Sequence, residues 1–408
     1  MKLNKLKLAY LCDSIALFSI YAVVFFLPIS KALIESFVCL ALVSCLLKKI
    51  INKEGLPRSW FNLTILIYVI VCLVSIFIST NFRISVKTFF FKLLEDVFFL
   101  LVVVDTLNNR ARIKNMLYIF LVSSLLLGID GIFQYFTYRD FLRGRVMAPL
   151  GRRLTASFVN PNAFGCFLAS LIPYSLVQVF NKFNNKIFRL IATVLFLTLI
   201  ICLLLTVSRG AWFAFIGSIV FMSIWLPYLG LVVTALLLII ILLFQLQHSF
   251  LNMRLKNFFI FKDVGAVDRR VIWGAGWNMF KASPWMGLGL GTFMFNFKEF
   301  VTDKSFYISY AHNCYLQIIA EIGIIGLFSF LLILVFFFFR GIKLLILNPK
   351  TFNWYLLLAA LASLLSYCIH MMVETIFYSV DLGLLFWLIM GFGIAIMNNI
   401  DGKEICRQ

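Results

Sequence analysis

Residues 314–339 read CYLQIIAEIGIIGLFSFLLILVFFFF, an apolar run that holds one carboxylate, Glu321. A helix needs about 20 consecutive apolar residues to cross a bilayer, so this run predicts a membrane-spanning helix. The whole chain has the same character, because 63% of its 408 residues are hydrophobic and only 13% are charged. Ordinary globular chains carry about 25% charged residues. The sequence therefore predicts an all-α, polytopic membrane protein.

Eleven further apolar runs make about twelve candidate transmembrane helices in a single integral membrane domain, 1–408. The second, eighth and ninth runs are short or closely joined, so a count of eleven is an alternative. The longest stretch without an apolar run, 248–312, predicts one large loop that contains an amphipathic helix. Besides 314–339, the runs cover 8–28, 32–47, 60–80, 86–105, 115–136, 161–181, 188–206, 210–227, 230–247, 354–374 and 380–398.

Basic residues outnumber acidic ones, with 36 Lys and Arg against 17 Asp and Glu and a formal net charge of +19. They are scattered between apolar runs, a pattern that suits membrane topology and anionic headgroups, so nucleic acid is excluded as a partner. Among the short segments, those on the side of the N-terminus carry more Lys and Arg. The positive-inside rule therefore predicts that both termini are cytoplasmic. Nine cysteines form no CxxC pair and predict neither a disulfide framework nor a zinc site.

The segment between the fifth and sixth spans concentrates arginines on the outer side, against this topology bias. A guanidinium matches phosphate oxygens through two parallel hydrogen bonds, so the cluster predicts an electropositive vestibule for an anionic substrate. A solvated loop that touches lipid phosphates is the alternative. The arginines are Arg139, Arg143, Arg145, Arg152 and Arg153.

Two short polar segments mark outer ends of spans. In TASFVNPNAFG (155–165), Asn160 suits the cap of a helix that begins at Pro161, with Asn162 next to it. A helix N-terminus attracts anions, although this one could simply be a well-capped span. In LTVSRGAWFAF (205–215), Ser208 and Arg209 stand between two apolar runs with almost no loop. An arginine at that depth is costly unless it is paired or faces a polar cavity, so a functional role is favoured over snorkelling.

Within the large loop, DRRVIWGAGWNMF (268–280) reads as a helix capped by Asp268. Arg270, Trp273 and Trp277 recur at i, i+3 and i+7 and share one face, which could lie on the membrane surface. The glycines of SPWMGLGLG (283–291) lack the strand–loop–helix context of a nucleotide site, so nucleotide binding is rejected.

The large loop ends at AHNCYLQ (311–317), just before a span. His312 is the only one of the three histidines that has polar neighbours at a span entrance, and Asn313 follows it. Gln317 and Glu321 are spaced i and i+4 and could line the same cavity, or they could only form a hydrogen bond.

Lys92, Glu95 and Asp96 lie inside the predicted span 86–105. Ionisable residues within a membrane are functional candidates, but Lys92 and Asp96 are also spaced to neutralise each other.

Four blocks, taken in order, resemble the O-antigen ligase and polymerase family of bacterial envelope proteins. They lie within 155–340, the O-antigen ligase-like region, and read TASFVNPNAFG (155–165), LTVSRGAWFAF (205–215), DRRVIWGAGWNMFKASPWMGLGLGTF (268–293) and AHNCYLQIIAEIGIIGL (311–327). The resemblance implies a fold similar to the C-type membrane glycosyltransferases. It also implies a bacterial inner-membrane enzyme that transfers a glycan from undecaprenyl pyrophosphate at the periplasmic face. That reaction is inverting and uses no cofactor, metal or nucleotide sugar. The acceptor would be lipid A-core for a ligase, which we favour, or a growing polysaccharide for a polymerase.

The essential family residues fall on Arg209, Arg270 and His312, which the resemblance implies as catalytic. Arginines can stabilise the charge on a pyrophosphate leaving group, and a histidine can take the proton of the acceptor hydroxyl. A transporter or lipid flippase is the alternative from another class, but no internal repeat supports it. The expected substrate-binding residues are Arg143, Arg145, Arg152, Arg153, Asn160, Asn162, Ser208, Trp273, Asn313, Gln317 and Glu321.

Overall fold

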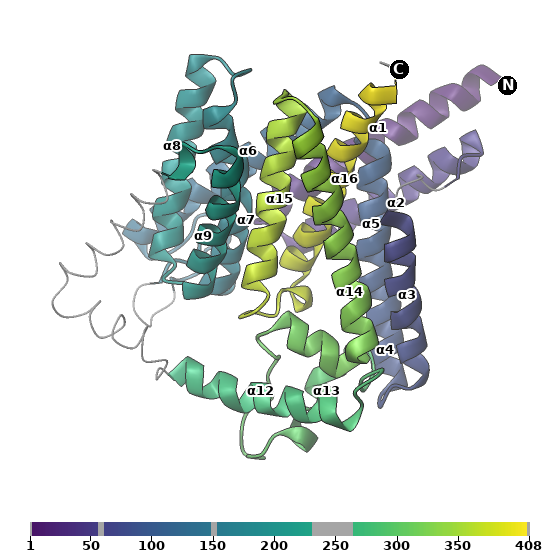
Figure 1. Ribbon diagram of the computed structural model, residues 1–408, viewed down its shortest axis with the longest axis vertical. Helices are drawn as coiled ribbons and strands as arrows, with labels where there is room; N and C mark the ends of the chain where they lie inside the picture. The colour runs from purple at the N-terminus through teal and green to yellow at the C-terminus, as the bar shows by residue number, and fades with distance from the viewer. Residues whose placement is uncertain (1, 56–60, 148–152, 231–263, 406–408) are drawn as a thin grey trace.

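The computed structural model describes residues 2–55, 61–147, 153–230 and 264–405. Over these residues the chain is helical, apart from turns and one isolated antiparallel bridge between Arg139 and Val146. Most helices stand side by side in a bundle, while α12 (Val264–Ala282) and α13 (Phe293–Phe300) lie across one end of it (Figure 1). Both chain termini lie at the other end of the bundle (Figure 1).

Each predicted span on the described residues corresponds to helical structure, and seven of these helices are long and apolar enough to cross a membrane. This confirms a multi-pass, all-α membrane protein, while the count of about twelve stays a prediction. The predicted span 230–247 lies outside the described residues, except for Gly230. The bundle helices are α1 (Lys2–Phe26), α2 (Lys31–Asn52), α3 (Phe61–Phe77), α4 (Phe82–Thr88), α5 (Leu94–Thr106), α6 (Arg110–Thr137), α7 (Pro161–Phe180), α8 (Lys186–Leu205), α9 (Arg209–Trp225), α14 (Cys314–Leu347), α15 (Phe352–His370) and α16 (Val380–Ile405).

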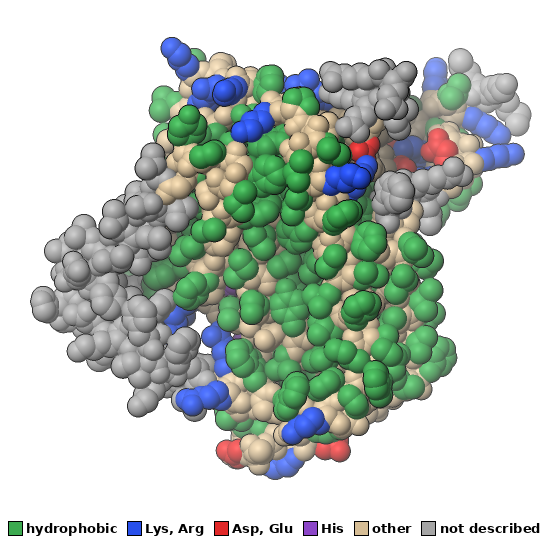
Figure 2. All heavy atoms as spheres, in the orientation of Figure 1, with side chains coloured by type: hydrophobic (Ala, Val, Ile, Leu, Met, Phe, Trp, Pro, Cys, Tyr) green, Lys and Arg blue, Asp and Glu red, His purple; other side chains and the backbone are tan. Residues whose placement is uncertain are grey.

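Hydrophobic side chains cover the middle of the face shown in Figure 2, and Lys and Arg gather towards its two ends. Helices α7, α15 and α16 form the centre of the bundle, since more than four-fifths of the residues in each of their apolar segments are buried. A helix that is apolar on all sides is stable only when neighbours or lipid surround it. Small residues let these helices approach closely: a Cβ on Gly165 of α7 would lie 2.7 Å from the Cβ of Ala211 on α9.

The predicted span 86–105 is not one regular helix. A π-helical turn, η1 (Phe89–Leu93), separates α4 from α5 and contains Lys92. Single π turns inside α-helices are rare and frequently mark functional sites, because the extra residue redirects the side chains around it.

A kink in α14 holds the α12–α13 layer on the bundle. Gly323 adopts φ 67° and ψ −171°, and a Cβ there would lie 2.2 Å from the carbonyl oxygen of Trp285. Only glycine fits this left-handed, crowded position. Across the kink, the amides of Leu288 and Gly289 donate to the carbonyls of Ala320 and Glu321 at 3.1 and 2.8 Å. The backbone groups released by the kink therefore bind the loop that follows α12.

The expected cap at Asp268 is wrong. Helix α12 already includes Val264, so Asp268 lies a turn inside the helix, and its Oδ2 accepts a hydrogen bond from the Tyr307 hydroxyl at 3.2 Å. The helical pattern continues upstream of Asp268, and an aspartate inside a helix is free to bind a neighbouring segment instead.

At the end of the bundle that carries the termini, charged side chains join four helices. Lys48 of α2 lies 2.9 Å from Asp13 of α1 and 3.0 Å from Asp105 of α5. Lys49 also contacts Asp105, at 2.7 Å, and Arg112 of α6 contacts Asp13. Removing one partner of a mostly buried pair leaves an uncompensated charge, which is more costly than replacing the whole pair.

We expect Asp105→Asn to lower the free energy of unfolding by about 3 kcal/mol, since two lysines lose their shared partner. Thermal unfolding of the purified protein in detergent measures the change, with exposed Glu54→Gln as the control. Equal midpoints for Asp105→Asn and the wild type would show that the cluster contributes nothing to stability.

Candidate active site

Four segments that are distant in sequence meet around the carboxylate of Glu374. His312, just before α14, places its Nδ1 2.8 Å from Oε1 of Glu374. Asn162, the second residue of α7, donates from Nδ2 to Oε2 of Glu374 at 3.0 Å. The oxygen of the Asn162 amide accepts from Ser208 Oγ at 3.0 Å and from Arg153 Nη2 at 3.1 Å. This Glu374 network therefore joins the starts of α7, α9 and α14 to the segment after α15.

Helix capping fixes the neighbours of these residues. The side-chain oxygen of Asn160 accepts from the Ala163 amide at 2.8 Å, which confirms the expected cap of α7. The side-chain oxygen of Asn313 accepts from the Leu316 amide at 3.0 Å and caps α14 in the same way. Both asparagines are thus held by their own helices, and a contact of either with substrate stays a prediction.

The start of α9 is capped differently. Ser208 occupies the N-cap position, but its hydroxyl makes no capping bond and donates to Asn162 instead. Backbone N–H groups of the first turn of a helix carry partial positive charge, which favours an anion next to them. The helix that begins at Arg209 therefore presents an electropositive end to the Glu374 network.

The backbone is strained in three of the segments that meet around Glu374. Ala156, Val207 and His312 adopt φ values of 45°, 49° and 48°, in the left-handed region that non-glycine residues avoid. Each such residue costs of order 1–3 kcal/mol and persists only where the surroundings impose it; such strain clusters at functional sites. These three residues fall in three of the four blocks noted in the sequence.

Glu374 is an anion in this environment. Its side chain is only 13% exposed, and that burial alone would raise its pKa. The hydrogen bond and charge of His312, together with the hydrogen bond from Asn162, outweigh burial and lower the pKa of Glu374 to about 2. An ionised carboxylate only accepts hydrogen bonds, so Nδ1 of His312 carries the proton. In the neutral imidazole, Nε2 then has the free lone pair.

The sequence analysis missed Glu374. It lies in MMVETIF (371–377), at the end of the predicted span 354–374, where no motif draws attention to it. The available signal was its spacing of four residues from His370, which places two ionisable groups on one side of a membrane helix end. His370 is buried, and its Nδ1 has no hydrogen-bond partner.

The predicted catalytic arginines differ in their relation to the network. Arg209 begins α9 directly after Ser208, and the next residue, Gly210, is so close to the α15 end that a Cβ would lie 2.5 Å from Val373 Cγ2. Arg270 is exposed on α12, whereas its neighbour Arg269 is half-buried and acts electrostatically on His370.

Trp273 connects α12 to the segment that contains His312. Its indole Nε1 donates to the carbonyl of Ala311 at 3.0 Å, one residue before His312. Because Trp273 lies one helical turn after Arg269 and Arg270, this bond holds both arginines at the end of the bundle where His312 lies.

The described arginines of the expected five-arginine vestibule have different partners. Among its described members, only Arg153 joins the Glu374 network. Arg143 donates from Nε to the carbonyl of Ile29, and both Arg143 and Arg145 act electrostatically on Asp381 at the start of α16. No hydrogen bond within the described residues joins either side chain to the Glu374 network. Arg152 lies outside the described residues.

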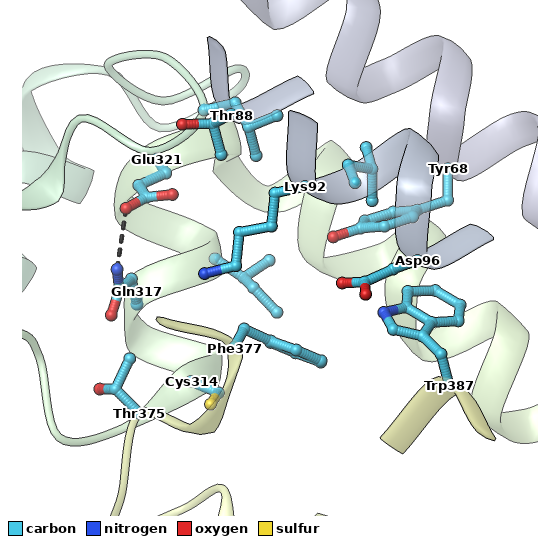
Figure 3. A pocket seen from close by; sticks show the side chains of 13 residues that line it. Tyr68, Thr88, Lys92, Asp96, Cys314, Gln317, Glu321, Thr375, Phe377 and Trp387 are labelled. Carbon is cyan, nitrogen blue, oxygen red and sulfur yellow. Dashed lines mark hydrogen bonds between the residues drawn. The ribbon is translucent and has the colours of Figure 1, made fainter. Parts of the chain in front are cut away.

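Gln317 and Glu321 have structural partners. Gln317 Nε2 donates to Glu321 Oε1 at 2.9 Å, and the Glu321 carboxylate accepts from the amides of Gly291 and Phe293 at 2.7 and 3.2 Å. Glu321 thus binds the start of α13. Both side chains also border a cavity of about 80 Å³ beside the first turns of α14, which Figure 3 shows together with Lys92 and Asp96.

The O-antigen ligase family model matches residues 194–331 of the chain. This match confirms the family resemblance, and it implies an enzyme of the membrane glycosyltransferase type. The matched region includes Arg209, Arg270 and His312, while Asn162 and Glu374 lie outside it. A comparison with curated proteins found no match.

The depressed pKa of Glu374 predicts a pH-dependent stability. A carboxyl whose pKa falls from 4.5 to about 2 on folding contributes on the order of 3 kcal/mol above pH 4.5, and this contribution is lost as pH falls towards 2. The difference in unfolding free energy between the wild type and Glu374→Gln should therefore shrink as the pH falls from 4.5 towards 2. Denaturation at a series of pH values measures it, with exposed Glu299→Gln as the control. A difference that does not change with pH would contradict the assigned ionisation.

Proposed function

We propose, for a chain whose residues 194–331 match the O-antigen ligase family, that it transfers a glycan from undecaprenyl pyrophosphate to an acceptor sugar. The reaction takes place at the periplasmic face of the bacterial inner membrane, with both termini in the cytoplasm. The acceptor is lipid A-core, which makes the protein an O-antigen ligase. The end of the bundle that holds α12 and α13 would face the periplasm, and the end that holds the termini would face the cytoplasm (Figure 1).

The observation that carries this proposal is the 2.8 Å contact between His312 Nδ1 and Glu374. It orients the imidazole so that Nε2 can take the proton of the acceptor hydroxyl as general base. The hydroxyl oxygen then attacks the anomeric carbon of the donor glycan, and the bond from that carbon to the pyrophosphate breaks. Attack on the face opposite the leaving group inverts the anomeric centre. Glu374 stabilises the imidazolium that forms.

The leaving group needs positive charge as it departs. Arg209 at the start of α9 and Arg270 on α12 supply guanidinium groups, and the first turn of α9 adds backbone amides. Ser208, Asn162 and Arg153 form the polar wall beside Glu374. Arginine side chains fixed by surrounding structure can stabilise the developing charge without a metal ion.

A polymerase of the same family is the second candidate, because the same residues would serve when the acceptor is itself a growing polysaccharide. The surface glycan of a deletion strain separates the two functions on a gel. A strain that keeps polymer on the lipid carrier but lacks it on the core supports the ligase. A strain that adds a single repeat unit to the core supports the polymerase, and a lipid-linked glycan that never reaches the periplasmic face would support a flippase.

We expect His312→Ala to reduce transfer by about 10²–10⁴-fold, the usual contribution of a general base, while donor binding survives. Purified enzyme with a lipid-linked donor in detergent measures both quantities. His312→Gln retains a hydrogen-bonding side chain near Glu374, so near-normal transfer by this variant would rule out the base and leave a purely electrostatic site.

We expect Arg209→Ala and Arg270→Ala each to lower transfer by about 10²–10³-fold, as the loss of one oxyanion-stabilising donor does. Lysine should restore little activity, because it lacks the planar fork of arginine. Arg143→Ala is the matched control, since Arg143 donates to the Ile29 carbonyl and makes no hydrogen bond to the Glu374 network. Normal transfer by Arg270→Ala together with loss in Arg269→Ala would reassign the role to the half-buried neighbour.

A further inference from the structure

A second set of ionisable side chains lies in a groove between α2, the α4–η1–α5 segment and the start of α16. The groove encloses a cavity of about 240 Å³, far larger than the ~10–15 Å³ that one water molecule requires. Its lining combines apolar residues with basic and acidic ones. The charged members are Glu35, Lys87, Lys92, Glu95 and Asp96.

The groove extends into the protein. The 80 Å³ cavity beside the first turns of α14 shares Thr88, Lys92 and Asp96 with it. In Figure 3 the Lys92 ammonium points into this inner cavity, on the side of Gln317. Lys92 belongs to the π turn η1, so the irregular turn is what directs this side chain inward.

The acidic and basic residues of the groove do not simply neutralise one another. No ion pair within 4 Å in the described part of the chain includes Glu35, Lys87 or Glu95. Glu35 of α2 and Glu95 of α5 lie close enough to repel each other. A cation between the two carboxylates would relieve that repulsion.

The lysines of the groove leave positive charge that an anion could neutralise. Asp96 acts electrostatically on Lys92 and offsets part of its charge, whereas Lys87 is exposed at the groove and has no ion pair. A ligand that neutralises both the carboxylates and the lysine of the groove must therefore carry a cationic group and an anionic group together. The large apolar side chain of Phe91, which lines the groove, is exposed and would contact acyl chains.

We propose that this groove binds the headgroup of a phospholipid that carries a primary ammonium, phosphatidylethanolamine. Lys87 binds its phosphodiester, and Glu35 and Glu95 accept hydrogen bonds from its ammonium. A phosphatidylglycerol headgroup would leave the two carboxylates without a cation. The quaternary ammonium of phosphatidylcholine has no N–H to donate. Charge-assisted hydrogen bonds are the stronger class of hydrogen bond, so they determine the preference among these lipids. This proposal does not depend on the reaction proposed above.

Native mass spectrometry of the purified full-length protein in detergent tests the proposal, with each of the three phospholipids added in turn. We expect phosphatidylethanolamine to be retained about tenfold more tightly than the other two, which corresponds to the loss of one charge-assisted hydrogen bond. Equal retention of phosphatidylglycerol would overturn the proposal and indicate a site for phosphate alone. Equal retention of phosphatidylcholine would also overturn it, because the ammonium would then make no hydrogen bond.

Substitutions in the groove test whether these side chains bind the lipid headgroup. The double change Glu35→Gln with Glu95→Gln should bring phosphatidylethanolamine down to the retention of phosphatidylglycerol, and Lys87→Gln should weaken both lipids together. Arg83→Gln is the matched control, because Arg83 is an exposed base on the same helix, outside the cavity lining. Unchanged preference in the double variant would overturn the proposal. If the double variant fails to fold, the ranking of lipids by the wild type and the Lys87→Gln result decide the question.

Discussion

A carboxylate buried at the end of a membrane helix requires hydrogen-bond donors on all sides, and Glu374 obtains them from other segments. His312 and Asn162 contact it from the starts of α14 and α7. The side-chain oxygen of Asn162 in turn accepts hydrogen bonds from Ser208 and Arg153. Because an unpaired buried charge is so costly, these helix starts must converge on one point. The relative positions of the helix ends therefore follow from a single electrostatic requirement.

The same requirement explains the irregular backbone around the network. Regular helices with standard caps would turn Ser208 towards its own helix and leave Val207 and His312 in relaxed conformations. Instead the Ser208 hydroxyl makes no capping bond. The left-handed φ values at Val207 and His312 turn the backbone so that these segments approach Glu374. Three of the four sequence blocks supply a member of the network or a strained residue beside it. The blocks are thus connected by contacts between turns, and the helices between them act as supports.

The remaining block, residues 268–293, depends on a different contact. Helix α12 lies across the bundle and reaches the network only because the kinked α14 binds the loop after α12 through its released backbone groups. Trp273 completes the attachment at the carbonyl of Ala311, next to His312. The arginines of α12 are therefore positioned by backbone and indole hydrogen bonds, while Arg209 is positioned by the start of its own helix. Both arrangements bring guanidinium groups to one end of the bundle, where a lipid-linked anion would arrive from the membrane.

The sequence by itself determined the membrane-spanning helices, because lipid requires long apolar runs with internally paired backbones. It also determined the cap at Asn160 and the polar helix ends that contain Ser208 and His312, since these depend on residues adjacent in the chain. Only the tertiary structure decided which polar ends meet. The partners of Glu374 and the different partners of Arg143 and Arg153 are contacts between residues far apart in sequence. Local patterns record the periodicity of one helix and the chemistry of its ends, whereas the pairing of a buried charge depends on neighbours that no local pattern identifies.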